Sequence, residues 1–415
     1  MIQDNRYEVS PDETLGKVDL SELDQEASIV KFVNQIIWEA YQQGSTDIHF
    51  EPMENELRIR YRVDGVLHQT PVSAQLNRFQ AAIISRIKVM ANMDIAEKRL
   101  PMDGRIGLRI QGKDIDIRVS TTPTVYGESV SLRLLQRSND FIKLEELGMS
   151  EKDSKLIHKI IQRPNGIILV TGPTGSGKST SLYAFLHEIN TIDVRIMTAE
   201  EPIEYEMVGI NQLLVRPEIG LTFARALRSF LRQDPDIIMV GEIRDLETAE
   251  IAIQASLTGH LVFSTLHTND AAGAFTRLLD MGVAPYLVAS AVEAVIAQRL
   301  IRKLCKFCKQ AIEPDMNFLR DIGFPVERLD SNIIYGTGTC EKCRMTGFRG
   351  RIGIFEILQV TEAIESLIIA HSATSKIKQK SIAEGMCTLR DDGWVKVLTG
   401  ITTVEEVLGV SEENE

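Results

Sequence analysis

The sequence predicts an α/β protein in which an α+β unit precedes a domain built on a mainly parallel sheet. Three observations support this class. The segment 172–179 has the sequence GPTGSGKS, a complete phosphate-binding loop, and it directly follows the apolar run 166–170. From residue 167 onward, short apolar segments alternate with longer helical ones, which is typical of parallel strands covered by helices. Before residue 140 the strand-like segments alternate apolar and polar residues, as half-buried strands do.

Composition and charge exclude several classes of protein. The chain has 415 residues, of which 44% are hydrophobic and 25% charged, so it is globular and long enough for two or three domains. It contains neither an apolar run of roughly 18 to 20 residues nor the basic start and apolar block of a signal peptide, which favours the cytoplasm. The net charge of −12 disfavours direct binding of nucleic acid.

Residues 1–26 are interpreted as an acidic lead-in. They contain eight acidic and two basic side chains, which gives the segment a net charge of −6. Such a composition buries too little apolar surface to offset the entropy lost on ordering. We therefore expect a flexible, solvated segment.

Residues 27–140 are predicted to form the first domain. Apolar residues recur at helical spacing from Ala27 until Gly44, where a helix would end. The segment 57–63 alternates apolar residues with arginines and is followed by Asp64-Gly65, which predicts a strand and a hairpin turn. An α+β unit is completed by a helix around 79–93 and strands at 106–110, 115–119 and 129–135.

Residues 141–415 are predicted to form the second domain. A parallel sheet of this kind binds its ligand at the carboxyl ends of the strands, and the motifs described below follow predicted strands. Within this domain we expect a cysteine-rich subdomain at 301–349 and a helical C-terminal part at 350–415. The predicted elements are strands at 167–171, 195–198, 237–240 and 261–265 and a helix over 180–189.

The phosphate-binding loop predicts a nucleotide site. Its glycines let consecutive backbone N–H groups turn toward one anion, and the N-terminus of the following helix adds its positive dipole end. Lys178 supplies a mobile cation for the outer phosphates, and Ser179 would hold Mg²⁺. The predicted nucleotide-binding residues are Gly172, Pro173, Thr174, Gly175, Ser176, Gly177, Lys178, Ser179 and Thr180.

Two acidic clusters supply candidates for the carboxylate that orients or deprotonates an attacking water. One is the segment 198–204, which contains Glu200, Glu201 and Glu204, and the other is the segment 237–242, which ends in Glu242. An ordinary second nucleotide motif ends its apolar strand with Asp, whereas Gly241 stands at that place here and Glu242 follows. Acidic residues at strand ends often only cap a helix, but beside a phosphate loop we predict that Glu204 and Glu242 are catalytic. His267 ends another predicted strand, where it would contact the outer phosphate.

Four cysteines in two Cys-x-x-Cys pairs, separated by 31 residues, predict a structural metal site. Four thiolates close a tetrahedral Zn²⁺ shell and leave no open position for catalysis. Iron in a similar cage is the alternative, and a redox dithiol is less favoured because two pairs are present. The fifth cysteine, Cys387, is interpreted as a small buried hydrophobe. The predicted zinc ligands are Cys305, Cys308, Cys340 and Cys343.

Arginines of the first domain are the remaining candidates for chemistry. An arginine that reaches a γ-phosphate from another domain or subunit stabilises the charge that develops there. Most surface arginines have no such role. The candidates are Arg99, Arg105, Arg118 and Arg133.

Taken together, these motifs resemble the type II secretion and type IV pilus assembly ATPases. The resemblance extends from Gly44 to Gly393. It implies a homohexameric ATPase with a PAS-like first domain and a RecA-like motor domain, and with ATP and Mg²⁺ bound between them. The segments that carry it are the phosphate loop, residues 200–204, 230–245 and 260–269, and the paired cysteines.

The resemblance also implies roles for single residues. Glu204 matches the general base of an acidic box, Glu242 belongs to an atypical second nucleotide motif, and His267 to a histidine box. Arg105 and Arg118 match arginines that reach the nucleotide across a domain or subunit interface. Domain motion then acts on an inner-membrane platform protein and drives assembly of a type IV pilus or a secretion pseudopilus. The protein would thus lie in the cytoplasm, peripheral to the inner membrane. The zinc element is similar to that of the assembly and secretion branch.

Two features depart from the family pattern. Glu201 stands where Asp is common, which lengthens any contact there by one methylene group. Longer members carry an additional N-terminal domain, which the acidic residues 1–26 cannot form. Two other functions stay open: a scaffold of a secretion complex that is gated by ATP binding alone, and a motor for DNA uptake, which the acidic net charge disfavours.

Overall fold

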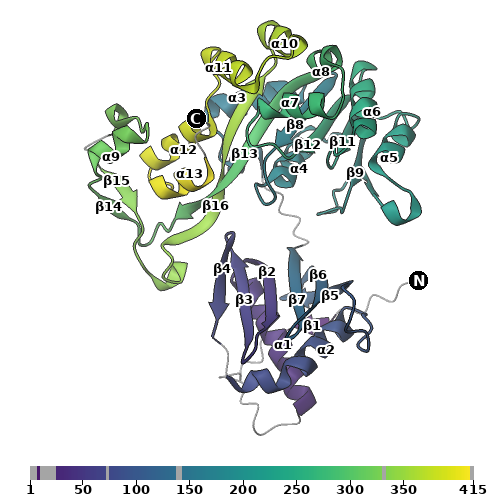
Figure 1. Cartoon of the computed structure of the whole chain (residues 1–415), viewed down its shortest axis with the longest axis vertical. Helices are drawn as coiled ribbons and strands as arrows, with labels where there is room; N and C mark the ends of the chain where they lie inside the picture. The colour runs from purple at the N-terminus through teal and green to yellow at the C-terminus, as the bar shows by residue number, and fades with distance from the viewer. Residues whose placement is uncertain (1–6, 10–24, 72–73, 137–142, 330–332, 412–415) are drawn as a thin grey trace. The chain divides into compact units, whose positions relative to one another are not determined.

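The computed structural model describes residues 7–9, 25–71, 74–136, 143–329 and 333–411 (Figure 1). The chain divides into two compact units, Met1–Asn139 and Asp140–Glu415, and each is described by itself. Among the helices of the described ranges, none combines the length and the apolar character that crossing a bilayer requires.

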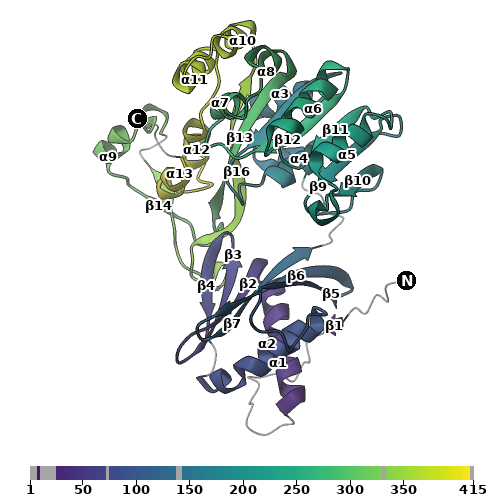
Figure 2. The same cartoon turned by 45° about the vertical axis from the view of Figure 1, so that its right-hand side comes forward.

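The first unit is built on one seven-stranded sheet with two helices packed on one of its faces (Figure 2). Neighbouring strands are antiparallel, except for one parallel pair at the edge. The helices are α1 (Gln25–Gln42) and α2 (Gln80–Met90). The strand order is β1 (Tyr7–Val9), β5 (Met102–Ile110), β6 (Lys113–Thr124), β7 (Gly127–Gln136), β2 (Ser45–Pro52), β3 (Leu57–Val63) and β4 (Val66–Thr70).

Alternation along the strands decides which face of this sheet is buried. Residues such as Ile48, Phe50 and Ile59 have no exposed surface and form the core with the two helices. The predicted hairpin between β3 and β4 is confirmed, since Asp64 and Gly65 both have positive φ angles, 50° and 87°. That conformation matches the twist of a two-residue hairpin and suits Asp-Gly.

The acidic lead-in contains a strand that the composition did not predict. Tyr7–Val9 forms β1 and pairs in parallel with residues 108–110 of β5. The Arg86 guanidinium lies 5.4 Å from the centre of the Tyr7 ring, which adds a side-chain contact to this pairing. The prediction of a flexible segment was therefore wrong for these three residues. Backbone pairing with a sheet edge does not depend on the charge of the flanking residues. The expectation for 1–6 and 10–24 lies outside the described residues.

The second unit is built on a seven-stranded sheet whose pairs are parallel, except for the last one. The strands expected at 167–171, 195–198, 237–240 and 261–265 are confirmed, with shifts of one or two residues at their ends. The strand order is β10 (Ile210–Leu214), β9 (Ile196–Glu200), β11 (Ile237–Val240), β12 (Leu261–Leu266), β8 (Gly166–Thr171), β13 (Val292–Leu304) and β16 (Phe348–Gln359).

Helices cover both faces of this sheet (Figure 1). On β8, Ile167 and Leu169 belong to one apolar cluster and Ile168 and Val170 to another, so the strand is buried on both sides. One cluster contains residues of α5 (Phe223–Phe230), α6 (Leu246–Leu257), α7 (Gly273–Asp280) and α8 (Pro285–Ala291). The other contains residues of α3 (Glu151–Ile161) and α4 (Lys178–Ile189).

The C-terminal part of the chain contributes a strand to the main sheet before it becomes helical. Residues 350–359, which we expected in a helical part, belong to β16 and pair antiparallel with β13. Buried Asp392 accepts a hydrogen bond from the Phe355 N–H at 2.9 Å, which ties this strand to the following helices. Those helices are α10 (Glu362–Ile369), α11 (Thr374–Ala383), α12 (Leu389–Leu398) and α13 (Val404–Val410).

The cysteine-bearing segment lies between β13 and β16. Its regular elements are short, as expected of a segment with little core of its own. They are β14 (Gln310–Ile312), α9 (Met316–Asp321) and β15 (Ile334–Gly336), with β14 and β15 paired antiparallel.

Candidate functional site

The phosphate-binding loop lies between β8 and α4, at the carboxyl edge of the parallel sheet. The strands β9, β11, β12 and β8 are parallel neighbours in the sheet. The strands that precede the predicted catalytic residues therefore end at the same edge as β8. Glu204 follows β9, Glu242 follows β11, and His267 follows β12.

Glycines are required in the loop for space as well as for backbone conformation. Gly172 and Gly177 have φ angles of 148° and 90°, which side chains of L-residues rarely adopt. A Cβ atom on Gly172 would lie 2.6 Å from the carbonyl oxygen of Gln298, and one on Gly177 would lie 2.8 Å from its Nε2 atom. A Cβ atom on Gly175 would meet no atom within 4 Å outside the adjacent residues, so this position of the loop is open.

The side chains of the loop are arranged to receive an anion. The Lys178 Nζ donates to the carbonyl oxygens of Gly172 at 2.7 Å and Pro173 at 3.1 Å. Burial lowers the pKa of Lys178 to about 8; nearby Glu242 opposes this shift and Arg299 adds to it. The Ser176 hydroxyl is buried and has no hydrogen-bond partner among the described residues. A phosphate group would accept hydrogen bonds from the Lys178 ammonium and the Ser176 hydroxyl. Ser179 lies, partly exposed, at the start of α4.

Glu242 is the centre of a charged cluster. Its Oε2 lies 3.6 Å from the His267 Nε2, and its other oxygen pairs with Arg244. Arg244 also contacts Glu201 at 3.1 Å, which links the acidic segment after β9 to Glu242. Burial and the charge of Lys178 lower the pKa of His267 below 6.5, so its imidazole is neutral at neutral pH. A neutral imidazole donates or accepts a hydrogen bond without adding charge.

Glu204 is half-buried, and its segment is fixed by Glu200. The Glu204 backbone N–H donates to the Tyr183 hydroxyl at 3.1 Å, and that hydroxyl pairs with Glu200. Glu200 is 4% exposed and also accepts from Thr198 at 2.6 Å and Gln212 at 3.0 Å. Burial raises the pKa of Glu200. Glu200 therefore holds the acidic segment in place, and Glu204 is the less buried residue of this pair.

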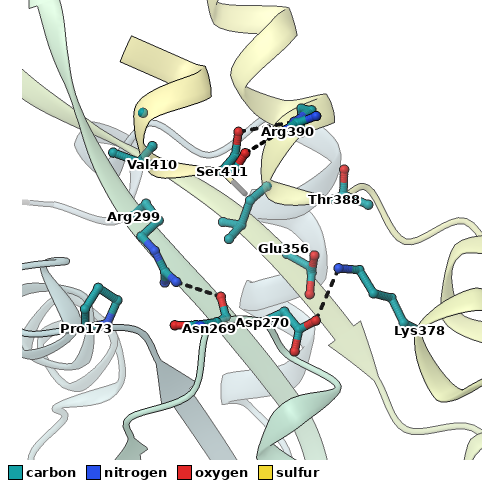
Figure 3. A pocket seen from close by; sticks show the side chains of 12 residues that line it. Pro173, Asn269, Asp270, Arg299, Glu356, Lys378, Thr388, Arg390, Val410 and Ser411 are labelled. Atoms are coloured by element: carbon teal, nitrogen blue, oxygen red, sulfur yellow. Dashed lines mark hydrogen bonds and ion pairs between the residues drawn. The ribbon is translucent and has the colours of Figure 1, made fainter. Parts of the chain in front are cut away.

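Sequence reasoning missed Arg244, which pairs with Glu242, and Arg299, which lies beside the phosphate loop. Arg244 had a signal, since it follows Glu242 by two residues on the same loop. Arg299 had none. It comes from β13, and its Nη2 donates to the carbonyl oxygen of Asn269 at 2.8 Å (Figure 3). Only the pairing of β13 with β8 brings Arg299 to the loop.

Three of the four predicted arginines of the first unit, Arg105, Arg118 and Arg133, form a row across its sheet. Arg99 precedes β5 and pairs with Glu97 at 2.8 Å. Arg105 pairs with Arg118, Arg118 with Arg133, and Arg133 with Asp47, so these side chains share one face. Neighbouring apolar residues such as Ile106 point to the opposite, helix-covered face. The Asp47 carboxylate accepts from Arg133 at 3.1 Å. These arginines lie in the first unit and the phosphate loop in the second.

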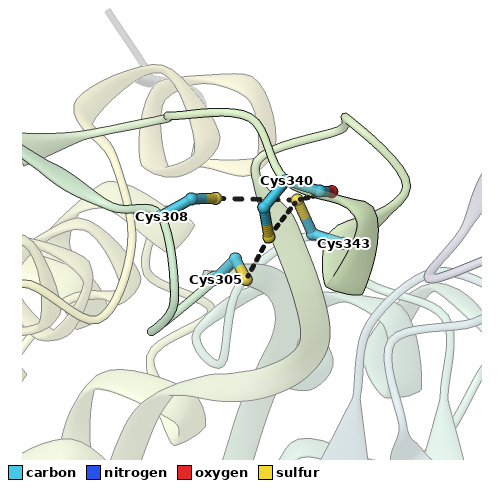
Figure 4. Close-up of side chains that lie close together, drawn as sticks. All are labelled: Cys305, Cys308, Cys340 and Cys343. Atoms are coloured by element: carbon cyan, nitrogen blue, oxygen red, sulfur yellow. Dashed lines mark hydrogen bonds between the residues drawn. The ribbon is translucent and has the colours of Figure 1, made fainter.

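The four predicted zinc ligands converge on one point (Figure 4). The sulfur atoms of Cys305 and Cys340 are 3.8 Å apart, and those of Cys308 and Cys343 are 3.6 Å apart. Tetrahedral Zn²⁺ with Zn–S bonds of ~2.3 Å places its sulfurs about 3.8 Å apart, so the donor set fits zinc. Cys387 is exposed, so its interpretation as a buried hydrophobe was wrong. It lies in the connection between α11 and α12.

We expect nucleotide affinity to depend on the ionisation of Lys178. With a pKa of about 8 the lysine is charged at lower pH, and it loses its charge as the pH rises through that value. Affinity should then fall by up to roughly tenfold per pH unit. Fluorescence titration with a nucleoside triphosphate analogue between about pH 7 and about pH 9.5 measures this. A flat profile for the wild-type chain would contradict the assignment, and Lys178→Ala is the control that should show no such fall.

Comparison with known proteins identifies a matching family and similar sequences. The model of the family described as "Type II/IV secretion system protein" matches residues 22–409. The chain is 50% identical over 397 residues to the type II secretion system ATPase E of Vibrio cholerae, with 95% of this chain and 78% of that protein covered. It is 49% identical over 387 residues to the type IV pilus assembly ATPase PilB of Thermus thermophilus, which covers 93% of this chain and 43% of that protein.

Solved structures share the mixed α/β fold. The pilus retraction motor PilT with bound ADP matches with a TM-score of 0.58 and 27% identity, over 92% of this chain and 97% of that one. The ATPase DotB of Legionella pneumophila matches with a TM-score of 0.68 and 21% identity, over 97% of this chain and 98% of that one. At this identity the match supports the fold alone.

Proposed function

The chain belongs to the type II/IV secretion system protein family and is a homologue of its ATPases, and from this premise we propose that it is a hexameric, Mg²⁺-dependent motor. In this proposal a RecA-like second unit and a PAS-like first unit move against one another as ATP is hydrolysed. That motion drives the assembly of a type IV pilus or of a type II secretion pseudopilus. Relatives from both branches match at nearly the same identity, 50% and 49%, so the proposal covers both.

The observation that carries the proposal is the state of the phosphate loop. Lys178 is held against two loop carbonyls, and the buried Ser176 hydroxyl beside it has no partner among the described residues. A bound phosphate would supply the Ser176 hydroxyl with the acceptor that it lacks, which removes the cost of a buried polar group without a partner. The phosphate would also place negative charge beside the Lys178 ammonium. The Glu242 and His267 pair stands at the same edge of the sheet. A cradle flanked by a carboxylate supports turnover as well as binding.

Each residue then has a defined task in hydrolysis. The loop backbone binds the phosphates, and Lys178 neutralises charge on the outer ones. Ser179 would hold Mg²⁺, which supplies further neutralisation of that charge when it is bound. Glu204 would accept the proton of the attacking water, because it is partly exposed, whereas Glu200 is buried and its carboxylate is held by three hydrogen bonds. Neutral His267, held near Glu242, would contact the outer phosphate and so respond to its presence.

Two arginines and a membrane partner complete the proposal. Arg105 and Arg118 would reach the nucleotide from the first unit of the same or a neighbouring copy, so the site would be complete only in the homohexamer. An inner-membrane platform protein would receive the motion, with this chain in the cytoplasm, peripheral to the membrane. The tetracysteine cluster would hold Zn²⁺ as a structural element.

Phosphate release by the purified full chain tests the proposal. The wild-type protein should hydrolyse ATP only with Mg²⁺, and turnover per chain should rise with protein concentration as the oligomer forms. Arg105→Ala and Arg118→Ala should keep ATP affinity and lose turnover by roughly 10³-fold, the scale expected for arginines that stabilise transferred phosphoryl groups.

Arg109→Ala is the matched control for these variants. Arg109 lies on β5 four residues beyond Arg105, outside the row, and forms an ion pair with Asp114, so its loss should leave turnover unchanged. Binding of ATP without any turnover by the wild-type chain would contradict the motor function and favour a nucleotide-gated scaffold. Full activity of both arginine variants would contradict their role.

A further inference from the structure

The loop at residues 268–272 joins the nucleotide site to the rest of the second unit. It begins directly after His267 and ends where α7 starts. At its first residue, the Thr268 N–H donates to the Thr171 Oγ1 at 2.8 Å, and the two hydroxyls are 2.7 Å apart. Thr171 is the last residue of the strand that leads into the phosphate loop. A shift of this loop would therefore move His267 relative to the phosphate cradle.

Side chains from the C-terminal third of the chain hold the other residues of this loop (Figure 3). Arg299 of β13 donates to the Asn269 carbonyl at 2.8 Å. Glu356 of β16 accepts from the Ala271 N–H at 2.9 Å. Lys378 of α11 reaches Asp270, with 3.2 Å between Nζ and Oδ2, and the other carboxylate oxygen of Asp270 accepts from the Gly273 N–H at 2.9 Å.

Lys378 supplies the positive charge that balances two buried acidic side chains, Asp270 and Glu356. Asp270 is 8% exposed and Glu356 is 1% exposed, so two acidic groups lie close together with little water. Burial raises the pKa of Glu356, the charge of Asp270 raises it further, and Lys378 opposes both. Removing one partner of a buried ion pair leaves an uncompensated charge, which is strongly unfavourable. Without Lys378 the loop would have to shift to expose Asp270 to water.

Lys378 forms its ion pair with the 268–272 loop, through Asp270. Its side chain lines a pocket of about 470 Å³ on the C-terminal side of the loop, together with Pro173, Glu356 and Arg390. Arg390 donates to the carbonyl and hydroxyl oxygens of Ser411 in the same pocket. The ion pair of Lys378 is with Asp270 of the 268–272 loop, whereas Pro173 of the phosphate loop lines the same pocket, so the test must separate an effect on turnover from an effect on nucleotide binding.

We propose that Lys378 is a positioning residue for turnover, which fixes the 268–272 loop through Asp270 and thereby places His267 against Glu242. The inference rests on the proposed function, ATP hydrolysis at the phosphate loop. It assigns to α11, far from the sequence motifs, a share in the geometry of the active site. The loop backbone at 172–179 does not depend on this contact, so ATP binding should survive its loss.

Steady-state kinetics and binding with the full chain test the inference. Lys378→Met should lower kcat by roughly 10- to 100-fold, as misplaced catalytic groups do, while the Kd for ATP changes by less than about twofold. Lys378→Arg keeps the charge and should recover most of kcat. Lys378→Met combined with Asp270→Asn removes the uncompensated charge and should also recover part of it, because Asn can still accept from Gly273.

Lys376→Met is the matched control, since Lys376 lies on the same helix and is exposed. A kcat for Lys378→Met equal to that of this control would overturn the inference. Loss of ATP binding together with kcat, with no recovery by arginine, would show a merely structural role and also overturn it. If Lys378→Met does not fold, the double variant and Asp270→Asn decide by the same comparison. An inactive wild-type chain would instead overturn the proposed function.

Discussion

Replacing Lys178 by alanine should abolish ATP turnover. The lysine is the mobile cation of the phosphate loop, and its Nζ lies 2.7 Å from the Gly172 carbonyl, within the cradle. Without it the charge that develops on the transferred phosphoryl group loses its nearest cation. We expect kcat to fall by roughly 10³-fold or more, measured as phosphate released by the purified chain with Mg²⁺. Lys155→Ala is the control, because Lys155 is 74% exposed on α3.

Glu242→Gln should abolish turnover in a different way. Glutamine keeps the size of the side chain but removes the charge that pairs with Arg244 and faces His267. ATP binding should persist because the loop backbone is untouched. Full activity in both Lys178→Ala and Glu242→Gln would refute the location of the site. Loss of binding in Glu242→Gln would indicate that this carboxylate supports the fold of the site.

Changing Cys305 and Cys340 to serine should remove the metal and unfold the cysteine-bearing segment. The freshly purified wild-type chain should contain one zinc per molecule, measured by elemental analysis. Structural zinc sites contribute roughly 10 kcal/mol or more to the folding of the segment that holds them, and the elements here are too short to replace that. Limited proteolysis should then cut the double variant between residues 305 and 347.

A cysteine outside the cluster supplies the control. Cys387 is exposed and distant in sequence, so Cys387→Ser should keep the zinc. A wild-type chain without metal would contradict the site, and iron in place of zinc would be seen in the same elemental analysis and in visible absorption. A disulfide found between these cysteines would favour the redox alternative, in which no metal is required.

Local patterns predicted much of the fold because they report local physics. The Asp64-Gly65 turn adopts the positive φ angles that its residue types favour. The apolar runs at 167–171 and 237–240 are strands buried on both faces, as expected between two layers of helices. The family resemblance, which rested on several motifs in order, is confirmed by the match over residues 22–409.

The predictions that failed concern residues whose surroundings come from segments remote in the sequence. Tyr7–Val9 is a strand because β5 offers an unpaired edge, and residues 350–359 are a strand because β13 lies beside them. Cys387 was expected to be buried because cysteines usually are, yet it lies exposed in the connection between α11 and α12. In each case the outcome depended on what another part of the chain placed nearby.

The sequence by itself determined the class of protein, the phosphate loop and the four-cysteine cluster, since each is encoded in residue types at short, set spacings. Only the tertiary structure decided that Arg244 links Glu242 to Glu201, that Arg299 lies beside the phosphate loop, and that Lys378 holds the loop after His267. Contacts between β13, β16, α11 and the 268–272 loop join residues far apart along the chain, and no local pattern records them. The physical reason is that charge pairing and burial act through space, so the folded packing decides which groups share a site.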